Sequence, residues 1–144
     1  MNADRSKLLH GELTERILGS FYIVYNSLGY GFLEKVYENA LKIELEESGF
    51  PVEQQLPIQV RYRDRVIGDY FADLCADNKV ILELKSVEKL NATHVAQLYN
   101  YLKSTNYEVG LLLNFGPKPE FERRVFENKN PQLSVQSAKS AYPL

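Results

Sequence analysis

The sequence has one cysteine, Cys75, and no tryptophan among its 144 residues. A single cysteine excludes an internal disulfide and a cysteine-rich zinc site, so we expect Cys75 to be a small buried residue in a strand. No apolar run approaches the ~20 residues that span a bilayer. The charged N-terminal stretch resembles neither a signal peptide nor a transit peptide. The sequence therefore predicts no membrane segment and a cytoplasmic location.

An excess of basic residues is also lacking, since 17 lysines and arginines face 19 acidic residues, for a net charge of −2. Proteins that bind nucleic acid over a broad surface usually carry a basic excess. Any nucleic-acid contact must therefore be confined to a cleft or a hairpin, or depend on a metal. Glycine-rich nucleotide-binding loops and the Gly-x-Ser-x-Gly elbow are absent, which argues against nucleotide-cofactor and serine-hydrolase chemistry.

Hydrophobic periodicity predicts an α/β fold with the order α-α-β-β-β-α-β-(β), in which helices pack on a mixed sheet. In the second helix we expect Leu33, Val36, Tyr37, Ala40 and Leu41 to face the core. We expect one domain over residues 1–126 and a loosely attached tail over 127–144. The predicted helices cover 13–28, 33–48 and 91–104, and the predicted strands 58–62, 66–76, 80–85, 107–113 and 121–126. The segment 121–126 could instead form a short helix.

The stretch from Asp73 to Lys85 places charged residues in strands that are otherwise apolar. Strand interiors disfavour Asp, Glu and Lys, so these residues are costly unless they bind something. If residues 77–79 form a three-residue loop, Asp73 lies opposite Glu83, with Cβ atoms roughly 4.5–5.5 Å apart. A register slip by one residue would turn Asp73 to the other face of the sheet.

Two carboxylates so placed repel each other, and a divalent cation between them would remove the repulsion. Oxygen ligands of this kind suit Mg²⁺ or Mn²⁺, and the backbone carbonyl of Leu84 could supply another ligand. Lys85 would then lie beside the attacking water and help to position or deprotonate it. The alternative is a cross-strand salt bridge between Lys85 and the two acids on an exposed sheet face.

These residues resemble the core of a known family. Asp73 followed by Glu83-Leu84-Lys85 is similar to the D…(D/E)-x-K motif of the PD-(D/E)xK nuclease superfamily, with Ala72 in place of the proline. More narrowly, the stretch 31–37 fits the GxxExxY signature that names one branch of small proteins. The stretch 97–101 resembles the Q-x-x-x-Y element of RecB-like nucleases, and 110–116 resembles the closing strand and turn of the branch.

The resemblance implies a restriction-endonuclease-like fold and a metal-dependent nuclease. Asp73, Glu83, Lys85 and Glu34 would be the catalytic residues, and Asp73, Glu83, Leu84 and Glu34 would hold the metal. Glu34 could instead simply complement the helix dipole from the first turn of its helix.

Gln97 and Tyr101 share one face of the helix that follows the core motif. They would contact substrate or support the metal site, or else anchor that helix to the sheet. Arg61, Arg63 and Arg65 lie on or beside the first hairpin turn, where they could touch phosphates or form only a solvated face.

We therefore expect a Mg²⁺- or Mn²⁺-dependent nuclease acting on nucleic acid, DNA rather than RNA. Because the chain is acidic, a homodimer or a partner protein would help it to bind. One alternative is a catalytically weak or inactive nuclease-fold module that binds nucleic acid or protein. Another is a hydrolase of a phosphoester outside nucleic acid.

Overall fold

The computed structural model describes residues 9–127, so most of the expected tail over 127–144 lies outside the described residues. The described chain forms three helices and five strands in the expected order. The helices are α2 (Gly11–Leu28), α3 (Glu34–Glu47) and α4 (Ala92–Lys103). The strands are β1 (Val52–Tyr62), β2 (Arg65–Ala76), β3 (Val80–Lys85), β4 (Val109–Phe115) and β5 (Pro119–Val125).

The five strands form one mixed sheet in the order β1-β2-β3-β4-β5. Strands β3 and β4 are parallel and are connected through α4, whereas the other neighbours are antiparallel. The parallel pair requires a crossover connection, and α4 supplies it. Strand β3 is therefore central and buried, as its apolar sequence predicts.

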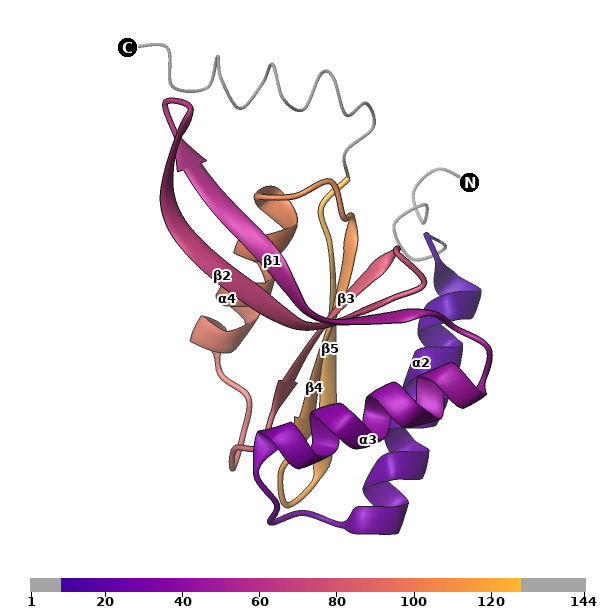
Figure 1. The fold of residues 1–144 in the computed structure, drawn as a ribbon. Helices are drawn as coiled ribbons and strands as arrows, with labels where there is room; N and C mark the ends of the chain where they lie inside the picture. The colour runs from indigo at the N-terminus through magenta and orange to yellow at the C-terminus, as the bar shows by residue number, and fades with distance from the viewer. Residues whose placement is uncertain (1–8, 128–144) are drawn as a thin grey trace, which may run out of the picture.

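Helices cover both faces of the sheet (Figure 1). Helices α2 and α3 pack on one face, where Phe21, Tyr37 and Leu41 meet Leu82 and other strand residues. Helix α4 packs on the opposite face, with Leu98 and Leu102 in the second core cluster. Cys75 is buried in this second cluster, as expected. Within residues 9–127, no helix is both long enough and apolar enough to cross a bilayer.

Three strands differ from their predicted bounds by two residues or more: β1, β4, and β5, which starts at Pro119 rather than at residue 121. Strand β1 starts at Val52 rather than near residue 58, because its polar start pairs with the end of β2. Strand β4 runs to Phe115 rather than to residue 113, since Asn114 and Phe115 are both fully buried and stay in register with β5. Tertiary pairing overrides the weak strand propensity of Glu, Gln and Asn at these positions.

The expected inner stripe of the second helix is partly wrong. Leu33 is 80% exposed and Val36 is 39% exposed. Leu33 precedes the first helical residue, and the buried apolar stripe of α3 is instead Tyr37, Leu41 and Leu45, spaced by four.

The loop before α3 needs a positive φ at Gly31, which is 116°. Only glycine adopts that value without strain.

Candidate active site

The turn between β2 and β3 has the register that the sequence predicts. Ala76 pairs with Val80, and the ladder continues to Leu74 and Leu82. Asp73 and Glu83 come next in this register, and here their side chains replace the ladder. Oε1 of Glu83 accepts a hydrogen bond from the Asp73 amide at 2.9 Å, and Oδ2 of Asp73 accepts one from the Leu84 amide at 2.8 Å. Each carboxylate thus accepts a hydrogen bond from a backbone N–H of the opposite strand.

One oxygen of each carboxylate is left for a ligand. Oδ1 of Asp73 and Oε2 of Glu83 accept no hydrogen bond from the described residues. No side-chain N or O atom of the described chain is both buried and unpartnered, so these two oxygens have some access to solvent. The pair is therefore fixed by the backbone on one side and open on the other.

The surroundings disfavour negative charge on both carboxyl groups. Burial is the main cause, and together with the charge of Asp73 it raises the pKa of Glu83 from 4.5 to about 8. Burial also raises the pKa of Asp73, with smaller contributions from Glu38 and Glu34. A cation at this position would reverse the effect, because a nearby positive charge favours the ionised carboxylates.

Lys85 follows Glu83 on β3 and is half-buried. Its charge lowers the pKa of both Asp73 and Glu83, so the ammonium lies close to the pair. Among the ion pairs of residues 9–127, none joins Lys85 to either acid. The alternative predicted from the sequence, a cross-strand salt bridge between Lys85 and the two acids, is therefore not formed.

Glu34 approaches the same place from the first turn of α3. Its Oε2 accepts a hydrogen bond from the amide of Ser86, the residue after Lys85, at 3.2 Å. The hydroxyl of Ser86 donates to the carbonyl of Phe32 at 3.2 Å, which ties the start of α3 to the end of β3. The charge of Glu34 raises the pKa of both Asp73 and Glu83, so it adds to the negative potential of the site.

Glu38 is a site residue that the sequence reasoning missed. It is 3% exposed, and its Oε2 accepts hydrogen bonds from Lys35 at 2.9 Å, Gln54 at 2.6 Å and Gln55 at 3.0 Å. Burial would raise the pKa of Glu38, but these hydrogen bonds outweigh burial and lower it. Glu38 is therefore ionised beside Asp73, and the only signal in the sequence is its spacing of four from Glu34.

Gln55 links Glu38 to the strand that carries Asp73. Gln54 pairs with Leu74 and Leu56 pairs with Ala72, so Gln55 lies opposite Asp73 in β1. Gln55 itself is left out of the ladder and has a φ of 59°. Such a conformation is unusual for a residue other than glycine and persists only when its surroundings hold it. The hydrogen bond to Glu38 is one contact that holds it.

Helix α4 brings Gln97 and Tyr101 together, as their spacing predicts. Nε2 of Gln97 donates to the Tyr101 hydroxyl at 3.2 Å. Burial and then the charges of Glu83 and Asp73 raise the pKa of Tyr101 to about 12. The hydroxyl therefore keeps its proton near the acid pair and can donate it in a hydrogen bond.

Asn114 holds the segment that follows Lys85. It pairs with Lys85 across β3 and β4 and is fully buried. Its side chain accepts from the Val87 amide at 3.0 Å and donates to the Val87 carbonyl at 3.0 Å. The sequence suggests Asn114 only as a turn residue, whereas in the structure its side chain holds the segment that follows β3.

Asp73 and Glu83 are the candidate ligands for a divalent cation. Within residues 9–127, no group of three or more Asp, Glu, His or Cys side chains is arranged so that it could hold a metal ion. Asp73 and Glu83 alone present two open oxygens from facing positions. Hard cations such as Mg²⁺ bind through one or two carboxylates and keep several waters, so this pair fits.

Comparison with family models gives a match to the PD-(D/E)XK nuclease superfamily over residues 11–125. The chain belongs to this superfamily. The match spans all eight elements, including the strand pair that carries Asp73, Glu83 and Lys85. PD-(D/E)XK nucleases act on nucleic acid and generally use divalent metals. Among curated proteins, none matches the chain significantly.

The solved structure of SSO0001 supports the fold. The crystal structure of SSO0001 is 14% identical, with a TM-score of 0.53, over 94% of this chain and 70% of that one. An alkaline exonuclease, LHK-Exo from Laribacter hongkongensis, is 12% identical, with a TM-score of 0.48, over 76% of this chain and 63% of that one. The mixed sheet with helices on both faces is the restriction-endonuclease-like fold of this superfamily.

Proposed function

We propose that the protein is a metal-dependent nuclease that hydrolyses phosphodiester bonds of nucleic acid at the Asp73–Glu83 site. The observation that carries this proposal is the pair of facing carboxylates, each bonded to the backbone of the opposite strand and each left with one open oxygen. Packing alone does not require two acids and a lysine on a central sheet face.

The side chains would divide the work as follows. Asp73 and Glu83 would hold Mg²⁺, or Mn²⁺, through Oδ1 and Oε2. The carbonyl of Leu84 would join them, since in a strand the N–H and C=O of one residue point to the same neighbour, and its N–H points to Asp73. The cation, when bound, polarises the scissile phosphate and lowers the pKa of the attacking water.

Lys85 would orient the attacking water and stabilise the negative charge that develops on the phosphate. Tyr101, which keeps its proton, would donate a hydrogen bond to a phosphate oxygen, with Gln97 holding its hydroxyl in place. Glu34 would act as an auxiliary acid, through the waters around the cation or through Ser86.

The finer assignments are part of the same proposal. The loop with Gly31, the Glu34 bond to Ser86 and the buried Tyr37 fit the GxxExxY branch of the superfamily. We propose Mg²⁺ or Mn²⁺ as the cation, DNA rather than RNA as the substrate, and the cytoplasm as the location. We further propose that residues 1–126 are one domain, and that a homodimer or partner protein strengthens binding by this acidic chain.

A second candidate function is a nuclease-fold module that binds nucleic acid or protein without efficient catalysis. The net charge of −2 favours it, because broad nucleic-acid binding usually needs a basic surface. The intact Asp73, Glu83 and Lys85 argue against it.

Cleavage assays distinguish the two functions. The protein is incubated with Mg²⁺ or Mn²⁺ and a panel of single-stranded, duplex and branched DNA and RNA, beside Lys85→Ala and a matched control, Lys79→Ala. Lys79 is exposed in the turn between β2 and β3. We expect cleavage by wild type and Lys79→Ala, and a loss of roughly 100-fold or more in Lys85→Ala. Equal cleavage by Lys85→Ala would indicate a contaminant, and no cleavage by wild type would favour the binding module.

A further inference from the structure

Strands β1 and β2 continue as a two-stranded arm beyond the rest of the sheet (Figure 1). Ile58 and Ala72 are the last buried residues before the arm, and from Gln59 to Phe71 only Val60 and Gly68 are partly covered. The arm exposes large apolar side chains, with Ile67 at 64% and Phe71 at 53%. An isolated two-stranded ribbon is at best marginally stable in water, which suggests that a partner covers this arm.

A tyrosine at the base of the arm connects it to the acid pair. The ring centroids of Tyr70 and Tyr101 are 6.0 Å apart. The charges of Glu83 and Asp73 help to raise the pKa of Tyr101, so Tyr101 lies close to both acids. Tyr70 is 47% exposed, so about half of the residue is accessible to a ligand. The surface that holds Tyr70 therefore begins at the proposed catalytic centre.

The absence of a side chain at Gly68 leaves room for the Tyr70 ring. A Cβ atom at position 68 would lie 2.8 Å from Cε2 of Tyr70, which is closer than van der Waals contact allows. The ring thus lies over the backbone of its own strand, held between Gly68 and Tyr101. A half-exposed aromatic ring with a fixed orientation is a preformed surface on which a flat group can stack.

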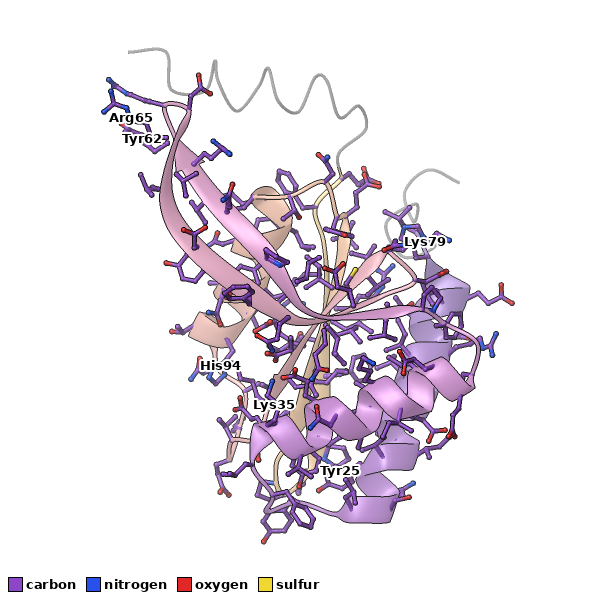
Figure 2. All side chains as sticks on the ribbon, viewed as in Figure 1. Tyr25, Lys35, Tyr62, Arg65, Lys79 and His94 are labelled. Atoms are coloured by element: carbon purple, nitrogen blue, oxygen red, sulfur yellow. The ribbon has the colours of Figure 1, made fainter. Side chains whose placement is uncertain are left out.

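The tip of the arm carries an excess of positive charge, although the chain as a whole has a net negative charge. Arg61, Arg63 and Arg65 lie within five residues and are all exposed, with Asp64 as the only acid among them. Figure 2 shows Tyr62 and Arg65 at the far end of the arm. The guanidinium of Arg63 lies over the ring of Tyr62, 5.4 Å from its centroid. The tip therefore combines aromatic surface with local positive charge in a protein whose net charge is −2.

We propose that the arm is a binding track for single-stranded nucleic acid that leads from its tip to the Asp73–Glu83 site. The arginines hold backbone phosphates, and Tyr62 and Tyr70 stack on bases. This proposal rests on the proposed nuclease function and names its substrate class. Cationic residues that follow the backbone, together with aromatic rings that stack on bases, are the usual elements of single-strand binding.

The exposed rings favour a single strand over a duplex. Bases in a duplex are already stacked on each other, so the face of Tyr70 would find no partner there, whereas an unpaired base offers its whole face. Arg65 and Asp73 are eight positions apart in the sequence. At ~3.4 Å per strand residue, the track is about 27 Å long. A fully stacked strand has one phosphate per ~3.4 Å, and bases that stack on the tyrosine rings instead are spaced further apart, so at most about eight nucleotides fill it.

The test is equilibrium binding of the full chain to labelled oligonucleotides, measured by fluorescence anisotropy in EDTA so that no hydrolysis occurs. Single strands of 4 to about 16 nucleotides are compared with blunt duplexes of equal length. The arm variants are Tyr70→Leu and a triple substitution, R61Q/R63Q/R65Q. Control variants carry matched changes elsewhere: Tyr22→Leu on α2, and a triple substitution of Lys42, Lys79 and Arg124 to Gln. Thermal melts verify that each variant is folded.

We expect wild type to bind single strands in preference to duplexes, with affinity rising up to about eight nucleotides and then levelling. The triple arm variant loses three phosphate contacts. Its plot of log affinity against log salt should therefore be less steep than that of wild type, by about 2 for a single strand. Tyr70→Leu weakens binding about tenfold and leaves the salt slope unchanged. Both controls bind as wild type does.

Three results would overturn the arm proposal: no single-strand binding by wild type, tighter binding of duplexes, or arm variants indistinguishable from their controls. The nuclease proposal fails separately. In that case wild type binds through the arm but cleaves nothing when Mg²⁺ or Mn²⁺ is added.

Discussion

Glu83 is one of the two proposed metal ligands, and its burial costs stability when no metal is bound. It is 5% exposed, it lies opposite another acid, and its pKa is raised from 4.5 to about 8. A group whose pKa is higher in the folded than in the unfolded state contributes its full stability only below the unfolded value. That contribution is lost as the pH rises through the folded value, so ionised Glu83 destabilises the metal-free protein.

Glu83→Gln should therefore stabilise the metal-free protein at alkaline pH. The glutamine can still accept the Asp73 amide bond, but it carries no charge. At pH 8.5 in EDTA we expect Tm to rise by at least ~3 °C, which is about 1 kcal/mol for a domain of this size. At pH 5 the difference should shrink, because Glu83 is then protonated in the folded protein.

Thermal melts from pH 5 to 8.5 measure this difference, and Glu53→Gln, at an exposed position on β1, is the control. A Tm difference between Glu83→Gln and wild type that stays constant with pH would show that Glu83 does not titrate in this range.

At the residue scale, the sequence predicts the acid pair but not its support. Asp73, Glu83 and Lys85 stand out because charges are rare in buried strands. Glu38 does not stand out, because a glutamate in a helix ordinarily faces solvent. Its burial depends on Gln54 and Gln55, which reach it from a strand whose start the sequence does not reveal.

At the scale of the elements, α3 and β1 together determine how β2 presents Asp73. Glu38 on α3 binds Gln55 of β1, and Gln55 lies opposite Asp73 with a φ of 59°. The sheet is thus interrupted on both sides of the acid: by Gln55 in β1, and by the side-chain bonds that replace the ladder to β3. This interruption leaves Asp73 free of regular pairing at the position where a ligand oxygen is needed.

Glu38→Gln should weaken this arrangement. A neutral amide is a poorer acceptor for Lys35, and its NH₂ group faces other donors. We therefore expect a loss of about 1–3 kcal/mol of stability. Because Gln55 is then held less firmly opposite Asp73, we also expect Mn²⁺ to bind several-fold more weakly. Chemical denaturation and calorimetry measure the two effects.

Glu46→Gln is the matched control for that experiment. Glu46 pairs with Lys42 at 3.0 Å on the exposed side of the same helix. Exposed pairs contribute less than about 1 kcal/mol, so this variant should behave nearly as wild type. If Glu38→Gln were as stable as Glu46→Gln and bound Mn²⁺ equally well, the supporting role of Glu38 would be wrong.

For the elements, periodicity predicts the order and the approximate extent of all eight. It fails where polar residues pair inside the sheet, as at the start of β1 and at Asn114 in β4. Such residues are held by tertiary hydrogen bonds, and the local sequence carries no record of those partners. The exposed Leu33 and Val36 are a different failure, because apolar residues at helical spacing predict a core face and these two lie outside the core.

On the scale of the whole molecule, the two faces of the sheet have different tasks. Helices α2 and α3 bury the larger core on one face, and α4 and the second core lie on the other. The track proposed above runs from Tyr101 on α4 to the arm that β1 and β2 extend beyond the sheet. An acidic protein can bind nucleic acid in this way, because the positive charge is concentrated at the tip of the arm.

The proposed domain boundary gives a prediction for the whole chain. Residues 9–127 already contain a continuous five-stranded sheet covered by helices on both faces. A chain that ends at residue 127 should therefore melt within about 2 °C of the full chain, a change of less than about 1 kcal/mol. A large drop in Tm would show that the domain extends past residue 127.

The most direct test of the account is calorimetric titration of the protein with Mn²⁺ at pH 8. Wild type is compared with Asp73→Asn, which keeps an acceptor for the Leu84 amide, and with Asp77→Asn, in the turn next to the site. We expect one Mn²⁺ to bind wild type and Asp77→Asn alike, and Asp73→Asn to bind at least about tenfold more weakly. No binding by wild type, or equal binding by Asp73→Asn, would contradict the proposal that the facing carboxylates are a metal site.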